Sequence, residues 1–361
     1  MMRWPWGSRA GGDHLVISWT GSTLSYVRAA RAADGLWHIA RFGVEHRGTD
    51  DVDGFLRRIQ LLELGGAAMH VVLRPEQYQL LQIEAPQVPP EEIRSAARWK
   101  IRDLVSTHVD DLTLDVMRVG DERVRATGQL FVVVTRNALV RELVELGEKL
   151  HSPVRVIDVH DIAQRNMQSL LALKEGSGDR ANAALVIVGS DLALLTISVH
   201  GELFYSRRME LGQGFVESRW SGHVSADSAG GDVFSSELEY VPEYVPAGSS
   251  MEGAFSESYG GVPNGAGTSV ASSVDERAQR FVVEVQRSLD LWERTWSSVP
   301  LNGVKVFAGA RSQELAQWLG QELGMNVTAM DVDPYFPGFE GGLDEERSLC
   351  WPLLGALLRD A

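Results

Sequence analysis

Cysteine and basic residues are scarce in this sequence, and each shortage excludes a class of protein. Cys350 is the only cysteine in 361 residues, which excludes a disulfide framework and a thiolate metal cluster and fits a reducing cytoplasm. Lys and Arg number 34 against 49 Asp and Glu, giving a formal net charge of -15. Such acidity argues against a nucleic-acid partner. The nine His show no metal-binding spacing, so no metal site is expected.

Long uninterrupted apolar runs are also missing. The most hydrophobic stretch, residues 181–199, is divided by a turn around Asp191 into two halves of strand length, so no membrane span is predicted there. Residues 1–12 contain two Trp between Arg residues but lack the apolar core of a signal peptide. We expect a flexible N-terminus, with contact to a membrane interface as the alternative. The protein is therefore predicted to stay in the cytoplasm.

Two meanders of three short strands open the two halves of the chain, at residues 14–45 and 184–208. Each consists of runs rich in Val, Ile, Leu and aromatic residues, separated by turns that contain Gly; this pattern is typical of a β-meander. Their equal order and spacing indicate an internal duplication. We therefore predict an α/β fold of two related domains that face each other across a cleft, which also suits a chain of this length.

A smaller unit interrupts the first half. Residues 77–150 show the pattern of a strand, a helix, two strands and a helix, which predicts an inserted β-α-β-β-α subdomain. The predicted division of the chain is 1–12 as the flexible N-terminus, 13–76 with 153–175 as the first domain, 77–152 as the inserted subdomain, 176–220 with 274–361 as the second domain, and 221–273 as a disordered acidic insertion rich in Gly and Ser.

The acidic insertion is the clearest break in composition. Gly, Ser, Ala, Pro and acids dominate it, and no Lys or Arg occurs between Arg219 and Arg277. Such a segment buries too little apolar surface to offset its ordering entropy. A solvated linker is the favoured interpretation, and transient anchoring of a partner by its tyrosines is the alternative. The sequence Ser273-Val274-Asp275-Glu276 matches a capping box and is expected to start the next helix.

A helix predicted from Pro90 to Val105 carries a candidate partner-binding surface. Its apolar face holds Ile93, Ala97 and Leu104, whereas Trp99 lies on the opposite side of the helical wheel. A large aromatic residue off the main stripe needs a second contact. That contact is either a neighbouring loop or a partner protein.

Two further features are interpreted as structural. Asp158, His160 and Asp161 are close in sequence, but no further ligand lies nearby; we expect Asp161 to cap a helix rather than to bind metal. The apolar run Trp351–Leu358 is expected to close the chain as a short helix.

The order of elements resembles the actin-like superfamily of sugar kinases, heat-shock ATPases and actin. Within it the chain is most similar to the actin-like proteins of type IV pilus assembly, the PilM group, and especially to its MSHA-biogenesis (MshI-type) members. The matching stretches are Glu84-Ala85-Pro86-Gln87-Val88-Pro89, Ala97-Arg98-Trp99-Lys100, Leu114-Asp115, Val132-Val133-Val134-Thr135-Arg136, Val156-Ile157-Asp158-Val159, residues 207–214 and Leu354-Gly355-Ala356-Leu357. The resemblance covers the whole chain except residues 1–12 and 221–273. It implies an actin-like, RNase H-like duplicated fold.

The resemblance also implies where a nucleotide would bind. Two Gly-turn hairpins would cradle the phosphates, and the matching residues here are Gly21, Ser22, Thr23, Gly189 and Ser190, with Gly309 as the remaining glycine of a third site near the adenosine. The carboxylate that precedes each hairpin in the superfamily is replaced by Ser18 and by Ile187. Loss of both removes the groups that would orient Mg²⁺ and the attacking water.

Two functions remain to be weighed. The first is a non-catalytic scaffold, a pseudo-ATPase without catalytic residues or cofactor, on the cytoplasmic face of the inner membrane. The resemblance implies that its partner would be the N-terminal tail of a PilN-like bitopic membrane protein, bound near Trp99 and Ile93. The second is an active ATP-binding or ATP-hydrolysing member of the same superfamily in pilus or type II secretion assembly. Ser18 and Ile187 favour the first.

Overall fold

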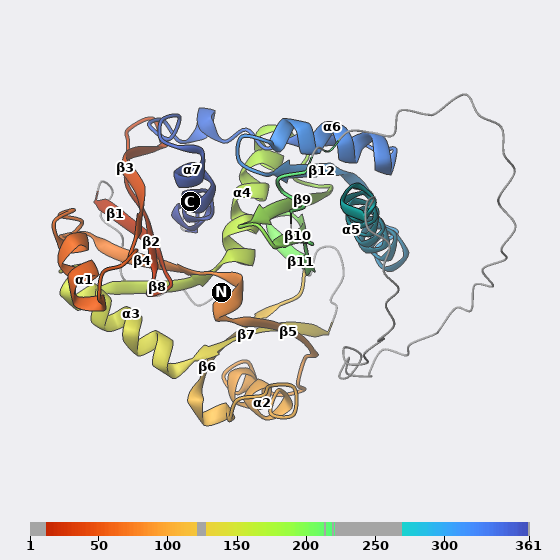
Figure 1. The fold of residues 1–361 in the computed structure, drawn as a ribbon. Coiled ribbons are helices and arrows are strands. Elements are labelled where there is room, and N and C mark those ends of the chain that lie inside the picture. The colour runs from red at the N-terminus through yellow and green to blue at the C-terminus, as the bar shows by residue number, and fades with distance from the viewer. Residues whose placement is uncertain (1–11, 121–127, 213, 219, 221–268, 360–361) are drawn as a thin grey trace, which may run out of the picture.

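In the computed structural model, residues 12–120, 128–212, 214–218, 220 and 269–359 are described. Residues 1–11 and 221–268, which contain most of the expected flexible N-terminus and acidic insertion, lie outside the described residues. The remainder is a mixed α/β structure (Figure 1).

Two five-stranded sheets share one topology. The first has the order β3-β2-β1-β4-β8 and the second the order β11-β10-β9-β12-β13. In each, three antiparallel strands form the predicted meander, and two parallel strands follow beside the first strand. The strands of the first sheet are Asp13–Trp19, Thr23–Arg31, Trp37–His46, Ala68–Leu73 and Val154–Val159 (β1, β2, β3, β4, β8). Those of the second are Ala181–Val188, Leu192–Val199, Glu202–Glu210, Leu301–Phe307 and Val327–Ala329 (β9 to β13). The predicted duplication is present in the fold.

A third sheet forms most of the inserted unit. Its order is β5-β7-β6, with strands Gln79–Glu84 (β5), Leu112–Arg118 (β6) and Gln129–Arg136 (β7), all antiparallel. Helix α2 (Ile93–Lys100) packs on one face, where Ala97 and Ile101 are fully buried. Helix α3 (Asn137–Lys149) packs with the core of the first sheet. The observed order β5-α2-β6-β7-α3 is the predicted one.

Two helices lie between the large sheets (Figure 1). Helix α4 (His160–Lys174) and helix α7 (Asp344–Leu357) cross there, and a single core joins them to both sheets. This core includes Val16 from β1, Ala184 from β9 and Trp351 from α7, all fully buried. The remaining helices are α1 (Val52–Gln60), α5 (Ser269–Thr295), α6 (Ser312–Leu323) and the 3-10 turns η1 (Pro75–Gln77), η2 (Val109–Asp111) and η3 (Asp333–Tyr335).

Several predicted helix ends were wrong. Helix α2 ends at Lys100 instead of Val105, because the chain tightens into i→i+3 hydrogen bonds such as Leu104 N–H to Ile101 O, and Leu104 is exposed. Helix α5 starts at Ser269 and not at Ser273, so the last residues of the expected insertion are helical.

The terminal helix is also longer than expected. It begins at Asp344, where three acids in the first turn suit the helix dipole. It continues through Pro352, whose missing N–H costs one hydrogen bond. The neighbouring residues Trp351, Leu353 and Leu354 are fully buried, and this burial offsets the loss.

Candidate functional site: a cleft, a buried joint and a groove

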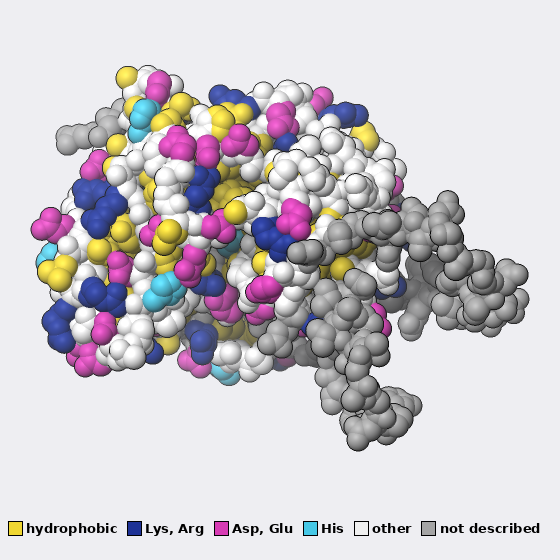
Figure 2. Space-filling view, turned by 45° about the horizontal axis from the view of Figure 1, so that its top comes forward, with side chains coloured by type: hydrophobic (Ala, Val, Ile, Leu, Met, Phe, Trp, Pro, Cys, Tyr) yellow, Lys and Arg dark blue, Asp and Glu magenta, His cyan; other side chains and the backbone are white. Residues whose placement is uncertain are grey.

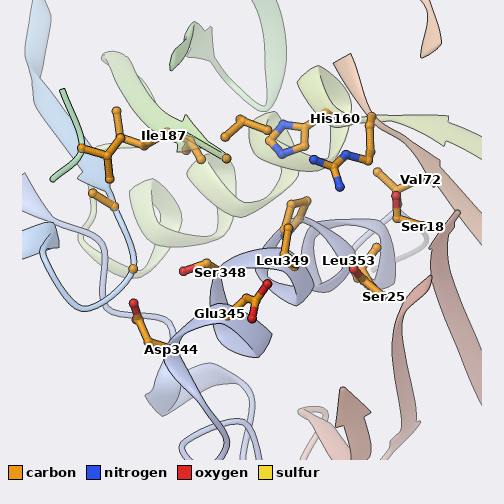
Figure 3. A pocket seen from close by; sticks show the side chains of 18 of the residues that line it. Ser18, Ser25, Val72, His160, Ile187, Asp344, Glu345, Ser348, Leu349 and Leu353 are labelled. Carbon is orange, nitrogen blue, oxygen red and sulfur yellow. The ribbon is translucent and has the colours of Figure 1, made fainter. Parts of the chain in front are cut away.

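A cavity of about 300 Å³ lies between the two large sheets, where the sequence predicts the nucleotide cleft. Figure 3 shows Ser18 and Ser25 on one side, Ile187 on another and α7 forming the floor. Its lining comprises Ser18, Ser25, Val72, Leu73, Arg74, His160, Val186, Ile187, Val188, Gly189, Val216, Ala308, Gly309, Arg311, Asp344, Glu345, Ser348, Leu349, Pro352 and Leu353.

The structure brings together only part of the predicted site. Gly189 and Gly309 line the cavity, both with positive φ (68° and 58°) that suits glycine. Ser18 and Ile187, the residues that stand in place of the superfamily carboxylates, line it as well. The other predicted residues are not among the lining residues: Gly21, Ser22 and Ser190 belong to the expected turns, and Thr23 is the first residue of β2.

Polar atoms without partners lie at one end of this cavity. The Ser18 hydroxyl and the His160 Nδ1 atom are buried and have no hydrogen-bond partner in the described chain. Burial lowers the pKa of His160 to about 4. The imidazole is therefore neutral at pH 7 and brings no charge to the cleft.

The two arginines of the lining differ in their contacts. Arg74 Nε lies 2.9 Å from Glu76 Oε1. Arg311 forms an ion pair of 2.7 Å with Glu314, donates to the carbonyls of Val216 and Ser218, and stacks over Trp220. Arg311 is therefore committed to contacts within the protein, whereas Arg74 contacts only the exposed Glu76 and its Nε makes no hydrogen bond in the described chain.

Helix α7 supplies the acids of the cleft. Asp344 Oδ1 accepts a hydrogen bond of 2.6 Å from the Ala310 N–H. A Cβ on Gly309 would lie 2.5 Å from the Ser348 hydroxyl and 2.9 Å from Asp344. The third glycine turn is thus covered by side chains of α7. The terminal helix predicted from the sequence was too short to include Asp344 and Ser348, so this contact was not predicted.

Beside the cleft is a buried polar joint that sequence reasoning missed. Asp161, 1% exposed, accepts hydrogen bonds from the hydroxyls of Tyr78 and Ser206, and Arg208 lies 3.9 Å away. Arg208 also donates to the carbonyls of Pro75 and Tyr78 and stacks over the Tyr78 ring. The joint ties β11 of the second sheet to the chain that enters the inserted unit.

The expected cap at Asp161 was therefore wrong. Val159 is the N-cap residue of α4 and Asp161 lies within its first turn, with its carboxylate committed to tertiary contacts. Asp158 is also buried and pairs with Arg359 at 2.9 Å. Among the described residues no group of three or more His, Cys, Asp or Glu is placed to hold a metal ion.

A groove of about 230 Å³ lies beside η1, at the end of the inserted unit where β5 and β6 begin and β7 ends. It is lined by Glu76, Gln77, Tyr78, Gln79, Val105, Ser106, Thr107, Leu112, Val134, Thr135 and Arg136. Strand β5 begins in this lining and is an edge strand of its sheet. An edge strand offers unpaired backbone groups to an extended peptide.

The two predicted partner-binding residues lie outside this lining. Trp99 is 72% exposed on the outer face of α2, with Arg102 over its ring at 5.9 Å. Ile93 is half-buried against the core of the inserted unit. The residues that form the groove, from Glu76 to Gln79 and from Val105 to Thr107, carried no sequence signal beyond a strand start and a helix end.

The surface charge is mixed. On the face shown in Figure 2, Lys and Arg side chains alternate with Asp and Glu, and no continuous basic surface forms. None of the helices in the described part of the chain is both long enough and apolar enough to cross a membrane.

The topology defines a two-domain actin-like fold, as expected. The chain is similar in structure to the "PilM-PilN type IV pilus biogenesis complex", with 16% identity and a TM-score of 0.62 over 96% of this chain and 98% of that chain. It is also similar to a Bacteroides thetaiotaomicron protein with an actin-like ATPase fold and unknown function (9% identity, TM-score 0.45, 94% and 96% covered). A third similarity is to the cytoplasmic domain of EpsL, an inner-membrane component of the Vibrio cholerae type II secretion system (13% identity, TM-score 0.39, 55% and 71% covered).

At these identities the similarities show the fold alone. No family model and no curated protein matches the sequence.

Proposed function

We propose that this protein is a non-catalytic, actin-like scaffold of a type IV pilus assembly platform, where it binds the cytoplasmic tail of a PilN-like membrane protein. The proposal is supported by the end-to-end similarity to the PilM-PilN complex together with a cleft in which Ser18 and Ile187 stand at the positions expected for metal-binding carboxylates. An MSHA-type pilus, as the sequence resemblance implies, is the finer form of this proposal.

Three features of the cleft support the loss of catalysis. Ser18 and Ile187 provide no carboxylate for a metal. Arg311 is held by Glu314 and by the carbonyls of Val216 and Ser218, so it is not available to a triphosphate. Side chains of α7 lie directly against Gly309. An active ATPase, the alternative function, would need these positions arranged differently.

A phosphate-release assay with Mg-ATP tests this part of the proposal. We expect no release above background from the purified protein. Release that disappears when Gly189 is replaced by a bulky residue would locate turnover in the cleft and favour the active-ATPase alternative, because Gly189 lines the cavity with a φ of 68°.

The partner is proposed to lie across the inserted unit, in the groove beside β5 and over the exposed Trp99. An extended tail would gain backbone hydrogen bonds from the edge of β5, with apolar side chains in pockets supplying specificity. Exposed tryptophans are frequent hot spots, and truncation of one commonly costs about 2 kcal/mol.

Fluorescence anisotropy with a labelled N-terminal peptide of the membrane partner measures this binding. Trp99→Ala should weaken it by roughly 30-fold without unfolding, because the side chain is 72% exposed. Leu173→Ala is the matched control, since Leu173 is 73% exposed at the far end of α4. Equal binding by both variants would place the partner site elsewhere.

A further inference from the structure

One face of α5 carries exposed arginines and aliphatic residues. The opposite face is buried against the second sheet, where Val285, Leu289 and Trp292 are at most 6% exposed. At 100° per residue, these exposed arginines and aliphatic residues lie within about 80° around the helix axis, a sector that Glu276 shares and Asp290 borders. This set, the arginine stripe, consists of Arg280, Val283, Arg287, Leu291 and Arg294.

The side chains of the arginine stripe are available for contacts. Arg287 and Arg294 form no ion pair or hydrogen bond with the described chain. Arg280 is 79% exposed and has one contact, at 4.0 Å from Glu276. Val283 and Leu291, between the arginines, are 41% and 51% exposed. Cations alternating with aliphatic groups along one helix face suit an acidic ligand that also carries apolar side chains.

The chain contains such a ligand directly before α5. Residues 221–268 hold seven acidic residues and no Lys or Arg, and α5 begins at Ser269. Within them, residues 237–245 read Glu-Leu-Glu-Tyr-Val-Pro-Glu-Tyr-Val. Three glutamates thus alternate with leucine, tyrosine and valine, the chemistry that complements the arginine stripe.

The dimensions also agree. Arg280 and Arg294 are 14 residues apart, or about 21 Å along a helix. Glu237 and Glu243 are six residues apart, or about 20 Å in an extended chain. Residues 246–268, which connect the motif to α5, can span up to about 80 Å, and this exceeds the length of the whole helix. The motif can therefore reach every position of the stripe.

We propose that residues 237–245 bind along the arginine stripe of α5 in the same molecule. Tethering gives this segment a high effective concentration, which a separate acidic ligand lacks. An anionic bilayer is the less favoured occupant, because the chain carries a formal net charge of -15 and would be repelled by it.

Limited digestion of the full chain with chymotrypsin tests this binding. Cleavage after Tyr240 and Tyr244 reports on the motif, and cleavage after Tyr259, outside it, is an internal reference in the same molecule. The variant R280Q/R287Q/R294Q should raise the rate of cleavage after Tyr240 and Tyr244 about tenfold, because the loss of three exposed ion pairs should weaken binding of the motif by about that factor. Cleavage after Tyr259 should be unchanged in this variant. In the wild type, about 0.5 M NaCl should also accelerate cleavage after Tyr240 and Tyr244, because salt screens exposed ion pairs.

Two further variants keep the result decisive. E237Q/E239Q/E243Q leaves the described structure untouched and should accelerate cleavage equally. R57Q/R141Q/R155Q removes the same charge from exposed arginines elsewhere and should change neither rate. Equal cleavage at Tyr240 and Tyr244 in wild type, R280Q/R287Q/R294Q and E237Q/E239Q/E243Q, or equal acceleration in the R57Q/R141Q/R155Q control, overturns the proposal. Loss of binding to phosphatidylglycerol vesicles in the stripe variant, with unchanged cleavage, overturns it in favour of a lipid surface.

Discussion

The crossing of α4 and α7 provides a sharp test of how the two halves are held together. A Cβ added at Gly355 would lie 2.0 Å from the backbone carbonyl oxygen of Ala163 and 2.6 Å from its carbon. Asn166 also donates a hydrogen bond of 2.9 Å to the Gly355 carbonyl. Only glycine allows the helices to approach this closely.

Gly355→Ala should therefore separate two helices that share one core. Overpacking of this kind costs about 3 kcal/mol, and the higher helix propensity of alanine returns about 1 kcal/mol. The expected net loss is about 2 kcal/mol in the free energy of unfolding. Urea unfolding at about 25 °C, followed by tryptophan fluorescence, measures it.

A second helical glycine serves as the matched control. A Cβ added at Gly320 in α6 would lie 3.5 Å from the backbone carbonyl oxygen of Met325, which is an ordinary contact. Gly320→Ala should gain about 1 kcal/mol from helix propensity alone. If Gly355→Ala is as stable as Gly320→Ala, the close approach of α4 and α7 is wrong.

Two other predictions concern the buried polar groups near the cleft. The pKa of His160 is about 4 when folded against an ordinary 6.5, so the unfolded state takes up the proton first and stability falls as pH drops from 6.5 to 4. Between about pH 7 and pH 5, wild type should lose about 2 kcal/mol more than His160→Gln in urea unfolding; parallel pH profiles would contradict this. Tyr78→Phe should cost about 2 kcal/mol, because it removes a donor from the buried Asp161 carboxylate. Tyr205→Phe, whose hydroxyl makes no hydrogen bond in the described chain, should cost little, and equal losses would refute the role of the Tyr78 hydroxyl.

The large features of the fold could be predicted because they depend on local patterns. Each meander is a set of apolar runs divided by glycine turns, and a period of two in hydrophobicity specifies a strand without further information. The ends of the helices were harder to predict from the sequence, because they depend on contacts with distant parts of the chain. The chain continues as a helix through Pro352 because buried neighbours compensate for the lost hydrogen bond. This compensation comes from tertiary packing, which the local sequence does not reveal. Likewise, the residues after Lys100 have helical periodicity but turn away.

Part of the candidate cleft could likewise be predicted from local sequence, and part could not. Ser18, Ile187, Gly189 and Gly309 could be found because each lies at the end of an apolar strand or in the turn that follows it. The approach of Asp344 to Gly309 could not be found, because it joins residues from different helices and loops through packing alone.

The buried joint illustrates the limit most clearly. Asp161 follows a strand and starts a helix, so its local sequence favours a cap or a metal ligand, and neither is its role. Its partners, Tyr78, Ser206 and Arg208, are 45 to 83 residues away in sequence. A buried carboxylate is tolerated only when such donors surround it. Because Arg208 reaches from β11 to the carbonyls of Pro75 and Tyr78, this charge fixes the second sheet against the entrance of the inserted unit. The chain around η1 contributes to both the cleft and the groove, because Arg74 lines the cleft and Glu76 and Gln77 line the groove. A joint that holds η1 in place therefore sets the shape of the groove proposed to receive the partner, even though no catalysis is proposed beside it.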